Sequence, residues 1–271
     1  MSDFLSDADF ELYRKLIYDE SGITFSSTNR AILESRLKER LREKKSDSLR
    51  EYYALIRGDK EELKTLLDSV TTNLTRFFRN QAHFDALEKH VVPELMKIKA
   101  AAGDRRLRIW SAGCSTGEEP YSVAMLLAEI LPPGWSFEVV ASDISLKCLM
   151  VGKEALYPDQ RIQGVPDTYL AKYFERKPGG YQLKDTIRKA VRFDYHNLKN
   201  DSGLKNLDVV ICRNVLIYFD EVAQKGTVER FWEAMAPKSF LFIGHSESLF
   251  GMNTKFEFVK TDWATFYRKF V

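Results

Sequence analysis

Residues 106–119, with the sequence RLRIWSAGCSTGEE, decide the fold class of this chain. They begin with a mostly apolar run, residues 107–110, that predicts a buried strand. They then pass through Gly113 and Gly117 into EEPYSVAMLLAEIL, in which apolar residues recur at helical spacing. A strand, a glycine-bearing turn and a helix in this order are typical of a Rossmann-like site, where the backbone must approach a ligand closely. An ordinary tight turn between a strand and a helix is the alternative interpretation.

The acidic start of this predicted helix indicates a ligand other than a pyrophosphate. Glu118 and Glu119 would repel phosphates, which favour a G-x-G-x-x-G turn with open backbone amides. Acidic residues also favour a helix N-terminus for structural reasons alone. Two carboxylates at the mouth of the turn fit S-adenosylmethionine, which carries ribose hydroxyls, an ammonium and a sulfonium. A second strand, predicted in FEVVASDIS, ends in Asp143, where an acidic residue commonly holds ribose hydroxyls.

Composition describes a soluble globular protein of one or two domains. The chain has 271 residues, of which 44% are hydrophobic and 30% charged. No apolar run approaches the roughly 18 residues of a membrane span, and the acidic N-terminus is unlike a signal peptide. The three cysteines lack metal spacing, so we expect reduced thiols, no metal site and a cytoplasmic location. A net charge of +2 gives no general case for nucleic-acid binding.

The first part of the chain reads as a set of helices. Helices are expected over residues 4–18, ended by Gly22, and over residues 29–45. Asp59 and Glu62 resemble a capping box at the start of a further helix. A long helix over residues 82–101 would lead into the α/β part.

The second helix has a basic face. Its stripe of leucines lies opposite Lys38, Arg42 and Lys45, and residues 26–60 hold 10 Lys/Arg against 6 Asp/Glu. Such a face is commonly no more than a solvated helix surface. The other interpretation is a docking surface for an acidic partner.

The alternation of helices and strands breaks down over residues 156–198. Pro158, Pro166 and the turn KPGG interrupt it, and YQLKD and IRKAVRFDYH follow as two short alternating strands. We therefore expect three parts: a helical N-terminal domain with its linker over residues 1–90, an α/β domain over residues 91–271, and a small antiparallel β-subdomain inserted into the latter over residues 156–198. A C-terminal β-hairpin, predicted in FEFVKT and ATFYRKF, is a feature of S-adenosylmethionine-dependent methyltransferase sheets.

Five motifs together resemble the chemotaxis receptor glutamate methyltransferases, the CheR family. They are TTNLTRFFR (71–79), WSAGCSTGEEPYS (110–122), ASDIS (141–145), CRNVLIYFD (212–220) and FIGHSE (242–247), in the order of the family and over nearly the whole chain. The resemblance implies a Rossmann-like methyltransferase sheet with an all-α N-terminal domain and an inserted β-subdomain. It also implies methyl transfer from S-adenosylmethionine to glutamate side chains on the cytoplasmic helices of chemoreceptors, with S-adenosylhomocysteine as the product.

The resemblance also implies the residues of the site. The family's cofactor contacts fall on Asn73, Thr75, Arg79, Glu119, Asp143, Asn197, Leu198, Arg213 and Asn214. Arg79 and Tyr218 match positions at the methyl-transfer site. A glutamate is already ionised at neutral pH, so the site needs alignment rather than a general base. Arg79 could grip the carboxylate with a planar fork and Tyr218 could orient it. Without the resemblance, a surface arginine and a core ring would explain the pair.

Two other functions are alternatives to this one. A nucleic-acid methyltransferase would be expected to show an N-P-P-Y-like segment or a Pro-Cys nucleophile, and neither is present. A non-catalytic adaptor is disfavoured by intact Arg79, Asp143 and Tyr218. We expect a monomer that binds receptor methylation helices through Lys38, Arg42 and Lys45, and binds no nucleic acid.

The expected β-subdomain contains a short turn. Members of the family that capture a C-terminal receptor pentapeptide by strand addition carry a longer glycine-bearing loop. Here residues 175–180 lack about three residues of that loop, and Pro178 removes a backbone donor. The sequence therefore predicts an enzyme of the pentapeptide-independent type.

Overall fold

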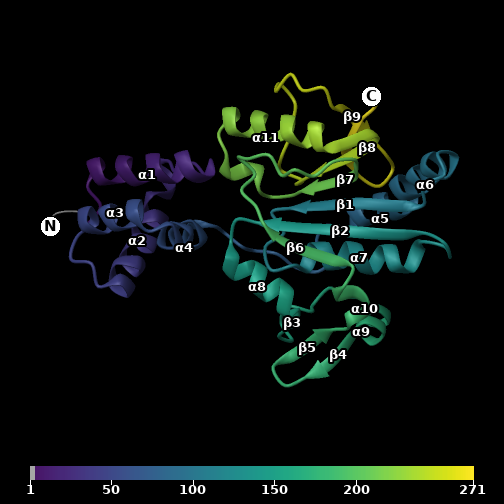
Figure 1. The fold of residues 1–271 in the computed structure, drawn as a ribbon, viewed down its shortest axis with the longest axis horizontal. Coiled ribbons are helices and arrows are strands. Elements are labelled where there is room, and N and C mark those ends of the chain that lie inside the picture. The colour runs from purple at the N-terminus through teal and green to yellow at the C-terminus, as the bar shows by residue number, and fades with distance from the viewer. Residues whose placement is uncertain (1–3) are drawn as a thin grey trace.

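The computed structural model describes residues 4–271 as a helical N-terminal body, an α/β domain and a small separate sheet (Figure 1). The N-terminal body consists of α1 (Asp7–Ser21), a 3₁₀ turn (Ser27–Asn29), α2 (Arg30–Lys44), α3 (Leu49–Gly58) and α4 (Lys60–Val70). Ser6 caps α1 by accepting a hydrogen bond from the backbone N–H of Asp9, and Gly22 ends the helix with a left-handed φ of 78°. The helices predicted at the start of the chain are therefore confirmed.

Helix α2 has the two faces that its sequence predicts. Leu33, Leu37 and Leu41 are buried in the N-terminal core, whereas Lys38, Arg42 and Lys45 are exposed. Lys45 lies one residue beyond the end of α2, with a left-handed φ of 54°.

The capping box predicted for α4 is only half present. Asp59 caps the helix by accepting two N–H groups of its first turn. Glu62 does not complete the box by accepting the backbone N–H of Asp59, because its carboxylate is buried elsewhere. It accepts hydrogen bonds from Tyr52 (2.7 Å) and Arg40 (2.6 Å) and forms an ion pair with Lys44 (2.7 Å). Burial acts to raise the pKa of Glu62, but these three donors outweigh it and hold the pKa below its usual value. The carboxylate thus joins α2, α3 and α4 rather than closing a cap.

The α/β domain is built on a seven-stranded sheet with the order β6-β2-β1-β7-β8-β10-β9. The five strands from β6 to β8 run parallel, while β10 and β9 form the predicted antiparallel C-terminal hairpin. The strands are β1 (Arg106–Ala112), β2 (Ser136–Asp143), β6 (Val191–Tyr195), β7 (Leu207–Cys212), β8 (Met235–Ile243), β9 (Glu257–Lys260) and β10 (Thr265–Lys269). The helices are α5 (Gln81–Ala86), α6 (Val92–Ala101), α7 (Glu118–Ile130), α8 (Leu146–Glu154) and α11 (Glu221–Ala234).

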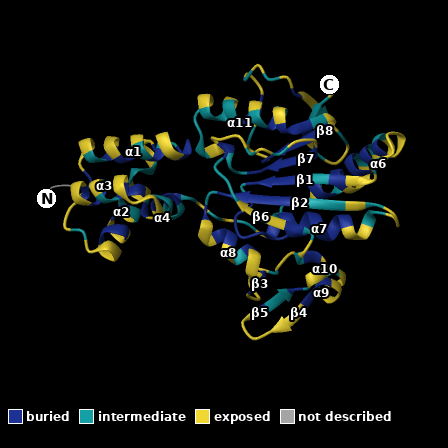
Figure 2. Ribbon diagram, in the orientation of Figure 1, coloured by how far each residue is buried: buried dark blue, intermediate teal, exposed yellow. Residues whose placement is uncertain are grey.

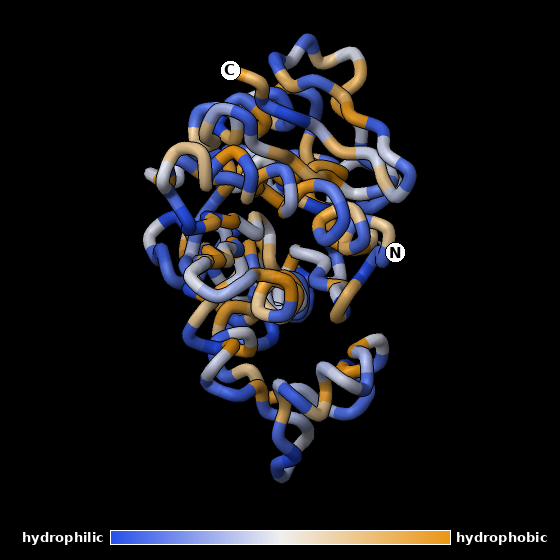
Figure 3. Tube along the Cα trace, turned by 90° about the vertical axis from the view of Figure 1, so that its right-hand side faces the viewer, coloured by the Kyte–Doolittle hydropathy of each residue, from blue (hydrophilic) through white to orange (hydrophobic). Residues whose placement is uncertain are grey.

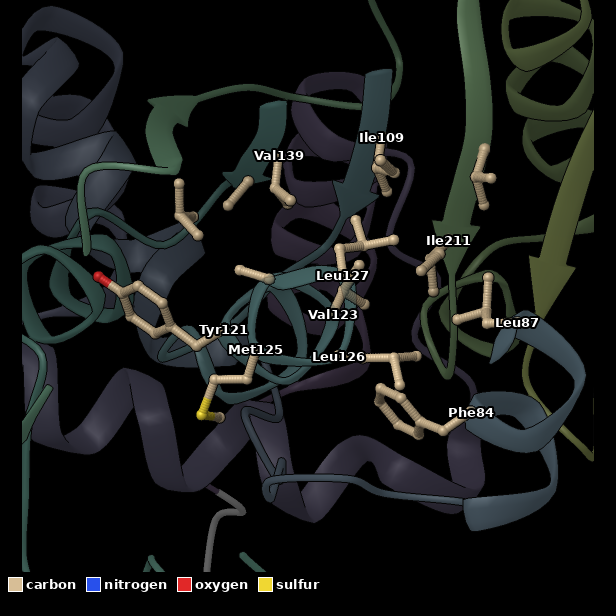
Figure 4. Close-up of a cluster of buried hydrophobic side chains, with 14 of the residues drawn as sticks. Phe84, Leu87, Ile109, Tyr121, Val123, Met125, Leu126, Leu127, Val139 and Ile211 are labelled. Carbon is tan, nitrogen blue, oxygen red and sulfur yellow. The ribbon is translucent and has the colours of Figure 1, made fainter. Parts of the chain in front are cut away.

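Both faces of this sheet are covered. On one face Ile109, Val139 and Ile211 pack against α7 and α5 (Figure 4). On the other face the neighbouring residues Trp110 and Val140 belong to a core that includes α11. The central strands are consequently buried along most of their length (Figure 2), which explains why their sequences are nearly continuous hydrophobic runs.

The predicted long helix over residues 82–101 is present, with one irregularity. It runs as α5, a π-helical turn (Leu87–Val91) and α6. Phe84, Leu87 and Val91 pack into the core of the α/β domain, whereas the N-terminal core ends at Val70. We therefore propose that the boundary between the two domains lies within residues 71–76 rather than near residue 90. None of the helices in the described part of the chain is both long and apolar enough to cross a membrane.

The inserted subdomain is smaller than predicted. It holds β3 (Leu156–Tyr157), β4 (Phe174–Lys177) and β5 (Gly180–Leu183) in an antiparallel sheet, with α9 (Asp167–Tyr173) and α10 (Asp185–Arg188), and it projects below the main body (Figure 1 and Figure 3). The prediction that IRKAVRFDYH supplies a subdomain strand is wrong. Its strand, β6, pairs in parallel with β2 at the edge of the main sheet. The alternating pattern identifies a strand but cannot say which sheet that strand joins.

Candidate active site

One large cavity lies at the carboxyl ends of the parallel strands, and it encloses about 1010 Å³ of space, its open mouth included. This is the edge at which open α/β sheets bind ligands. The structure brings all ten predicted catalytic and cofactor residues to its lining: Asn73, Thr75, Arg79, Glu119, Asp143, Asn197, Leu198, Arg213, Asn214 and Tyr218. They come from the linker, from α7, from the end of β2 and from the loops that follow β6 and β7.

The glycine turn shapes the floor of this cavity. Gly113 has a left-handed φ of +81°, and a Cβ added to it would lie 2.4 Å from Cγ2 of Val215. Any side chain at this position would therefore clash with Val215 and force it to move. Gly117 has a φ of +94° and precedes the first turn of α7. The glycines are thus required where the sequence predicts close approach.

Asp143 ends β2 with both carboxylate oxygens held by the backbone. Oδ2 accepts a hydrogen bond from the N–H of Ser115 (2.7 Å), and Oδ1 accepts one from the N–H of Ser145 (2.9 Å). Burial raises the pKa of the carboxyl, and the two N–H groups partly oppose that effect. Each oxygen retains a second lone pair, so the carboxylate can also accept hydrogen bonds from the hydroxyls of a ligand.

Glu119 and Arg213 form a partly desolvated charged pair beside the turn. Oε1 of Glu119 accepts a hydrogen bond from Ser111 (2.7 Å), and its Oε2 lies 3.5 Å from Nη1 of Arg213. Burial raises the pKa of Glu119 and lowers that of Arg213, and each charge opposes the shift of the other. Arg213 also donates to the backbone carbonyl of Arg79, while its buried Nε has no partner within residues 4–271.

Only one of the two acidic residues at the start of α7 faces the cavity. Glu118 is fully buried, and it accepts hydrogen bonds from Thr116 (2.6 Å) and from Arg161 of the inserted subdomain (2.8 Å). The expectation that both carboxylates lie at the mouth of the turn is therefore wrong. Successive residues of a helix point in directions about 100° apart, so adjacent carboxylates rarely share a site.

The linker presents Arg79 on a strained backbone. Its neighbours Phe78 and Asn80 have left-handed φ angles of 49° and 66°, a conformation that costs non-glycine residues on the order of 1–3 kcal/mol each. Ser122 fixes the segment by accepting the N–H of Phe78 (2.9 Å). Nη1 of Arg79 donates to the carbonyl of Leu74 (2.8 Å), and the other N–H groups of Arg79 make no hydrogen bond within the described chain.

The N-terminal domain closes one wall of the cavity, which the sequence does not predict. Ser21, the last residue of α1, and Ile23, two residues beyond it, line the cavity. Ile23 also forms an isolated β-bridge with Phe219. The side-chain amide of Asn197 donates to the carbonyl of Glu20 (2.6 Å), so in this structure it holds the N-terminal domain. No local pattern could have indicated these contacts, because they join residues far apart in the sequence.

The residues present fit S-adenosylmethionine. Asp143 and Glu119 supply carboxylates for hydroxyls and positive charge, the unpaired Nε of Arg213 suits a polar acceptor, and Gly113 leaves room for close approach. A parallel sheet with an appended antiparallel hairpin and this cavity define a Rossmann-like, S-adenosylmethionine-dependent methyltransferase.

Comparison with known proteins identifies the family. The model of the CheR methyltransferase SAM-binding domain matches residues 73–265, and that of the CheR all-alpha domain matches residues 8–71. This chain belongs to the CheR methyltransferase family, whose role is the methylation of chemoreceptor glutamates. The two matches meet within a few residues of the boundary proposed above.

Several curated relatives agree over nearly their whole length. A chemotaxis protein methyltransferase of Vibrio cholerae is 34% identical over 98% of this chain and 94% of its own length. Relatives of the same description from Borreliella burgdorferi and Escherichia coli are each 34% identical, over 90% and 93% of this chain and 89% and 88% of their own lengths. The chain is therefore a methyltransferase that uses S-adenosylmethionine.

Proposed function

We propose that this chain esterifies glutamate side chains on the cytoplasmic helices of chemoreceptors, with Arg79 and Tyr218 facing the acceptor carboxylate. The observation that supports this assignment most is that both side chains line the same cavity as Asp143 and Glu119, although they come from the linker and from the loop after β7. We also propose that the enzyme acts in the cytoplasm, as a monomer and without nucleic acid.

The chemistry requires positioning more than proton transfer. S-adenosylmethionine supplies an activated methyl group together with its own leaving group. A glutamate carboxylate is ionised at neutral pH, so no side chain has to remove a proton. The guanidinium of Arg79 would hold one carboxylate oxygen while the other is directed toward the methyl group. The hydroxyl of Tyr218 would orient the same carboxylate by a neutral hydrogen bond. Asp143, Glu119 and Arg213 would hold the cofactor.

Incubation with methyl-labelled S-adenosylmethionine and a receptor cytoplasmic fragment tests this function. Base-labile label on the receptor, lost when the acceptor glutamates are changed to glutamine, is the expected result. Label on added DNA or RNA would favour a nucleic-acid methyltransferase. Tight cofactor binding with no transfer to any acceptor would favour a non-catalytic adaptor.

We further propose that the basic face of α2 binds the acidic methylation region. Lys38, Arg42 and Lys45 are all exposed on one side of the N-terminal domain. Lys38 pairs with Glu34 at 2.5 Å, whereas Arg42 and Lys45 make no ion pair within residues 4–271. The charges of Arg42 and Lys45 are thus available to a partner.

Reversing these three charges to glutamate should raise the KM for receptor at low salt and leave cofactor affinity unchanged. Each exposed pair contributes only about 0.2–1 kcal/mol, so the three together should raise KM roughly 3- to 100-fold. The effect should shrink as salt is added, because exposed charges are screened. The same measurement on a triple reversal at three exposed lysines of the α/β domain provides the control: Lys225, Lys238 and Lys260. Equal receptor kinetics in both triple variants would show that this face is an ordinary solvated surface and does not bind the receptor.

We also propose that the enzyme works without a receptor pentapeptide tether. The hairpin between β4 and β5 turns within Lys177-Pro178-Gly179-Gly180, and within this small sheet the outer edge of β4 is longer than that of the two-residue β3. Pro178 removes one donor at the end of that edge. Titration with a free receptor C-terminal pentapeptide should therefore show no binding while S-adenosylhomocysteine binds normally. Micromolar binding of the pentapeptide would contradict the proposal.

A further inference from the structure

The loop that follows β7 carries three of the predicted site residues. Arg213, Asn214 and Tyr218 all lie within residues 213–219. Asn214 has a left-handed φ of 59°, which is uncommon for a residue with a side chain. Such a conformation persists only where surrounding contacts hold it, so the contacts of this loop decide where Tyr218 is placed.

One carboxylate, outside all the residues assigned so far, holds the first half of this loop. Oε2 of Glu247 accepts hydrogen bonds from the backbone N–H groups of Asn214 (2.9 Å) and Gly244, and Oε1 accepts one from the N–H of Ile217 (3.2 Å). Both oxygens are therefore used, and the side chain joins the end of β8 to the loop after β7. Hydrogen bonds to a charged acceptor are among the strongest a loop can make.

The approach of the two segments leaves no room for a side chain at Gly244. A Cβ at this position would lie 2.5 Å from Oε2 of Glu247 and 2.9 Å from the backbone nitrogen of Asn214. The absence of a side chain at Gly244 therefore allows the two segments to approach closely enough for Glu247 to bridge them. Glu247 is only partly exposed, consistent with this constrained position.

The second half of the loop has further contacts that do not involve Glu247. Nε2 of Gln224 donates to the carbonyls of Leu216 (2.9 Å) and Phe219 (3.0 Å), and the carbonyl of Tyr218 accepts the N–H of Thr24 (2.8 Å). Losing Glu247 would therefore loosen residues 213–217 without releasing the whole loop. An effect of Glu247 on the position of the loop can therefore be distinguished from an effect on the folding of the domain.

We propose that Glu247 is a positioning residue for methyl transfer, because it holds the backbone N–H groups of Asn214 and Ile217, the residues adjacent to Arg213 and Tyr218. The proposal rests on the proposed function in one respect, the role of Tyr218 toward the acceptor. Glu247 itself is not among the residues that line the cavity and acts through its neighbours.

The test compares Glu247→Ala, Glu247→Asp and Glu247→Gln with the exposed control Glu257→Ala. Alanine removes all three contacts, and aspartate is one methylene too short to bridge them. Glutamine keeps one oxygen acceptor and should recover part of the lost rate. We expect kcat for receptor methylation to fall about tenfold in the alanine and aspartate variants, the scale of a small misplacement of reacting groups. The KM for receptor should change less than kcat, and the control should behave as the wild type.

Two further measurements separate positioning from general destabilisation. Backbone amide exchange at Asn214 and Ile217 should accelerate in Glu247→Ala, while exchange in β1 stays unchanged. The loss of rate should also be smaller when Glu247→Ala is introduced into a Tyr218→Phe background, because residues acting through one another are not additive.

An unchanged kcat in Glu247→Ala would overturn the proposal. So would a fall in rate matched by accelerated exchange throughout the domain, or full additivity with Tyr218→Phe. If the proposed function itself fails, the wild-type enzyme transfers no label to receptor, while the exchange at Asn214 and Ile217 still reports whether Glu247 holds the loop.

Discussion

Replacing Arg79 with alanine is expected to lower kcat for receptor methylation about 100-fold, the cost of misplacing a reacting group by about 1 Å. The guanidinium lines the cavity and uses one N–H on the carbonyl of Leu74, which leaves its other donors for a carboxylate. Affinity for S-adenosylhomocysteine should fall much less than kcat, because the acceptor rather than the adenosine is expected at this position. Steady-state kinetics and calorimetry measure the two quantities.

Two matched variants control this experiment. Arg79→Lys keeps the charge but loses the planar fork, so it should recover only part of the rate. Arg105→Ala removes an exposed arginine just before β1, outside the cavity lining, and should leave turnover near the wild-type value. Full turnover of Arg79→Ala at saturating receptor would show that its proposed role is wrong. An equal loss in Arg105→Ala would show that the effect is not specific to the guanidinium of Arg79.

Tyr218→Phe is the companion to this prediction. The hydroxyl makes no hydrogen bond with another residue of the described chain, so its removal should leave the packing of the ring intact. A neutral hydrogen bond contributes about 0.5–1.5 kcal/mol, and kcat should accordingly fall about two- to tenfold with cofactor affinity preserved. Turnover equal to that of the wild type would remove Tyr218 from the methyl-transfer site.

Asp143→Ala should weaken binding of S-adenosylhomocysteine by about 1–3 kcal/mol, the scale of a lost charged hydrogen bond. The carboxylate is buried at the end of β2 and faces the cavity. No other acidic residue of the cavity lining lies on this strand, so the loss should not be compensated. Calorimetric titration gives the affinity directly, and an unchanged value would reject Asp143 as the acceptor for the ribose hydroxyls.

The structure adds a control to the prediction for Asp143. Asp143 also accepts the backbone N–H groups of Ser115 and Ser145, so alanine leaves two buried donors unpaired and should lower the melting temperature. Asp143→Asn retains one oxygen acceptor and tests the charge with a smaller loss of stability. The interpretation as a ligand contact requires that Asp143→Asn also weakens binding while its thermal unfolding stays close to that of the wild type.

Some features of the site could not be predicted because they depend on how side chains are directed. Glu118 and Glu119 are adjacent in the sequence, yet one pairs with Arg161 in the interior and the other faces the cavity. Glu62 fits the spacing of a capping box, but a buried cluster of donors offers its carboxylate more hydrogen bonds than the helix terminus does. In both cases the sequence predicts that a carboxylate makes a polar contact, but it does not predict which residues that carboxylate contacts.

Short-range patterns determined the fold class, and the family motifs predicted residues that the structure brings to one cavity. The strand, glycine turn and helix around Gly113 follow from the periodicity of side chains and from the conformational freedom of glycine, which are local properties. The motifs in which Arg79, Asp143 and Tyr218 occur are local as well, and they pointed to the family. Only the tertiary structure decided that β6 joins the main sheet, that Ser21 and Ile23 close the cavity, and that Glu247 holds the loop after β7. These contacts join segments distant in the sequence, and long-range packing rather than local periodicity selects which segments meet.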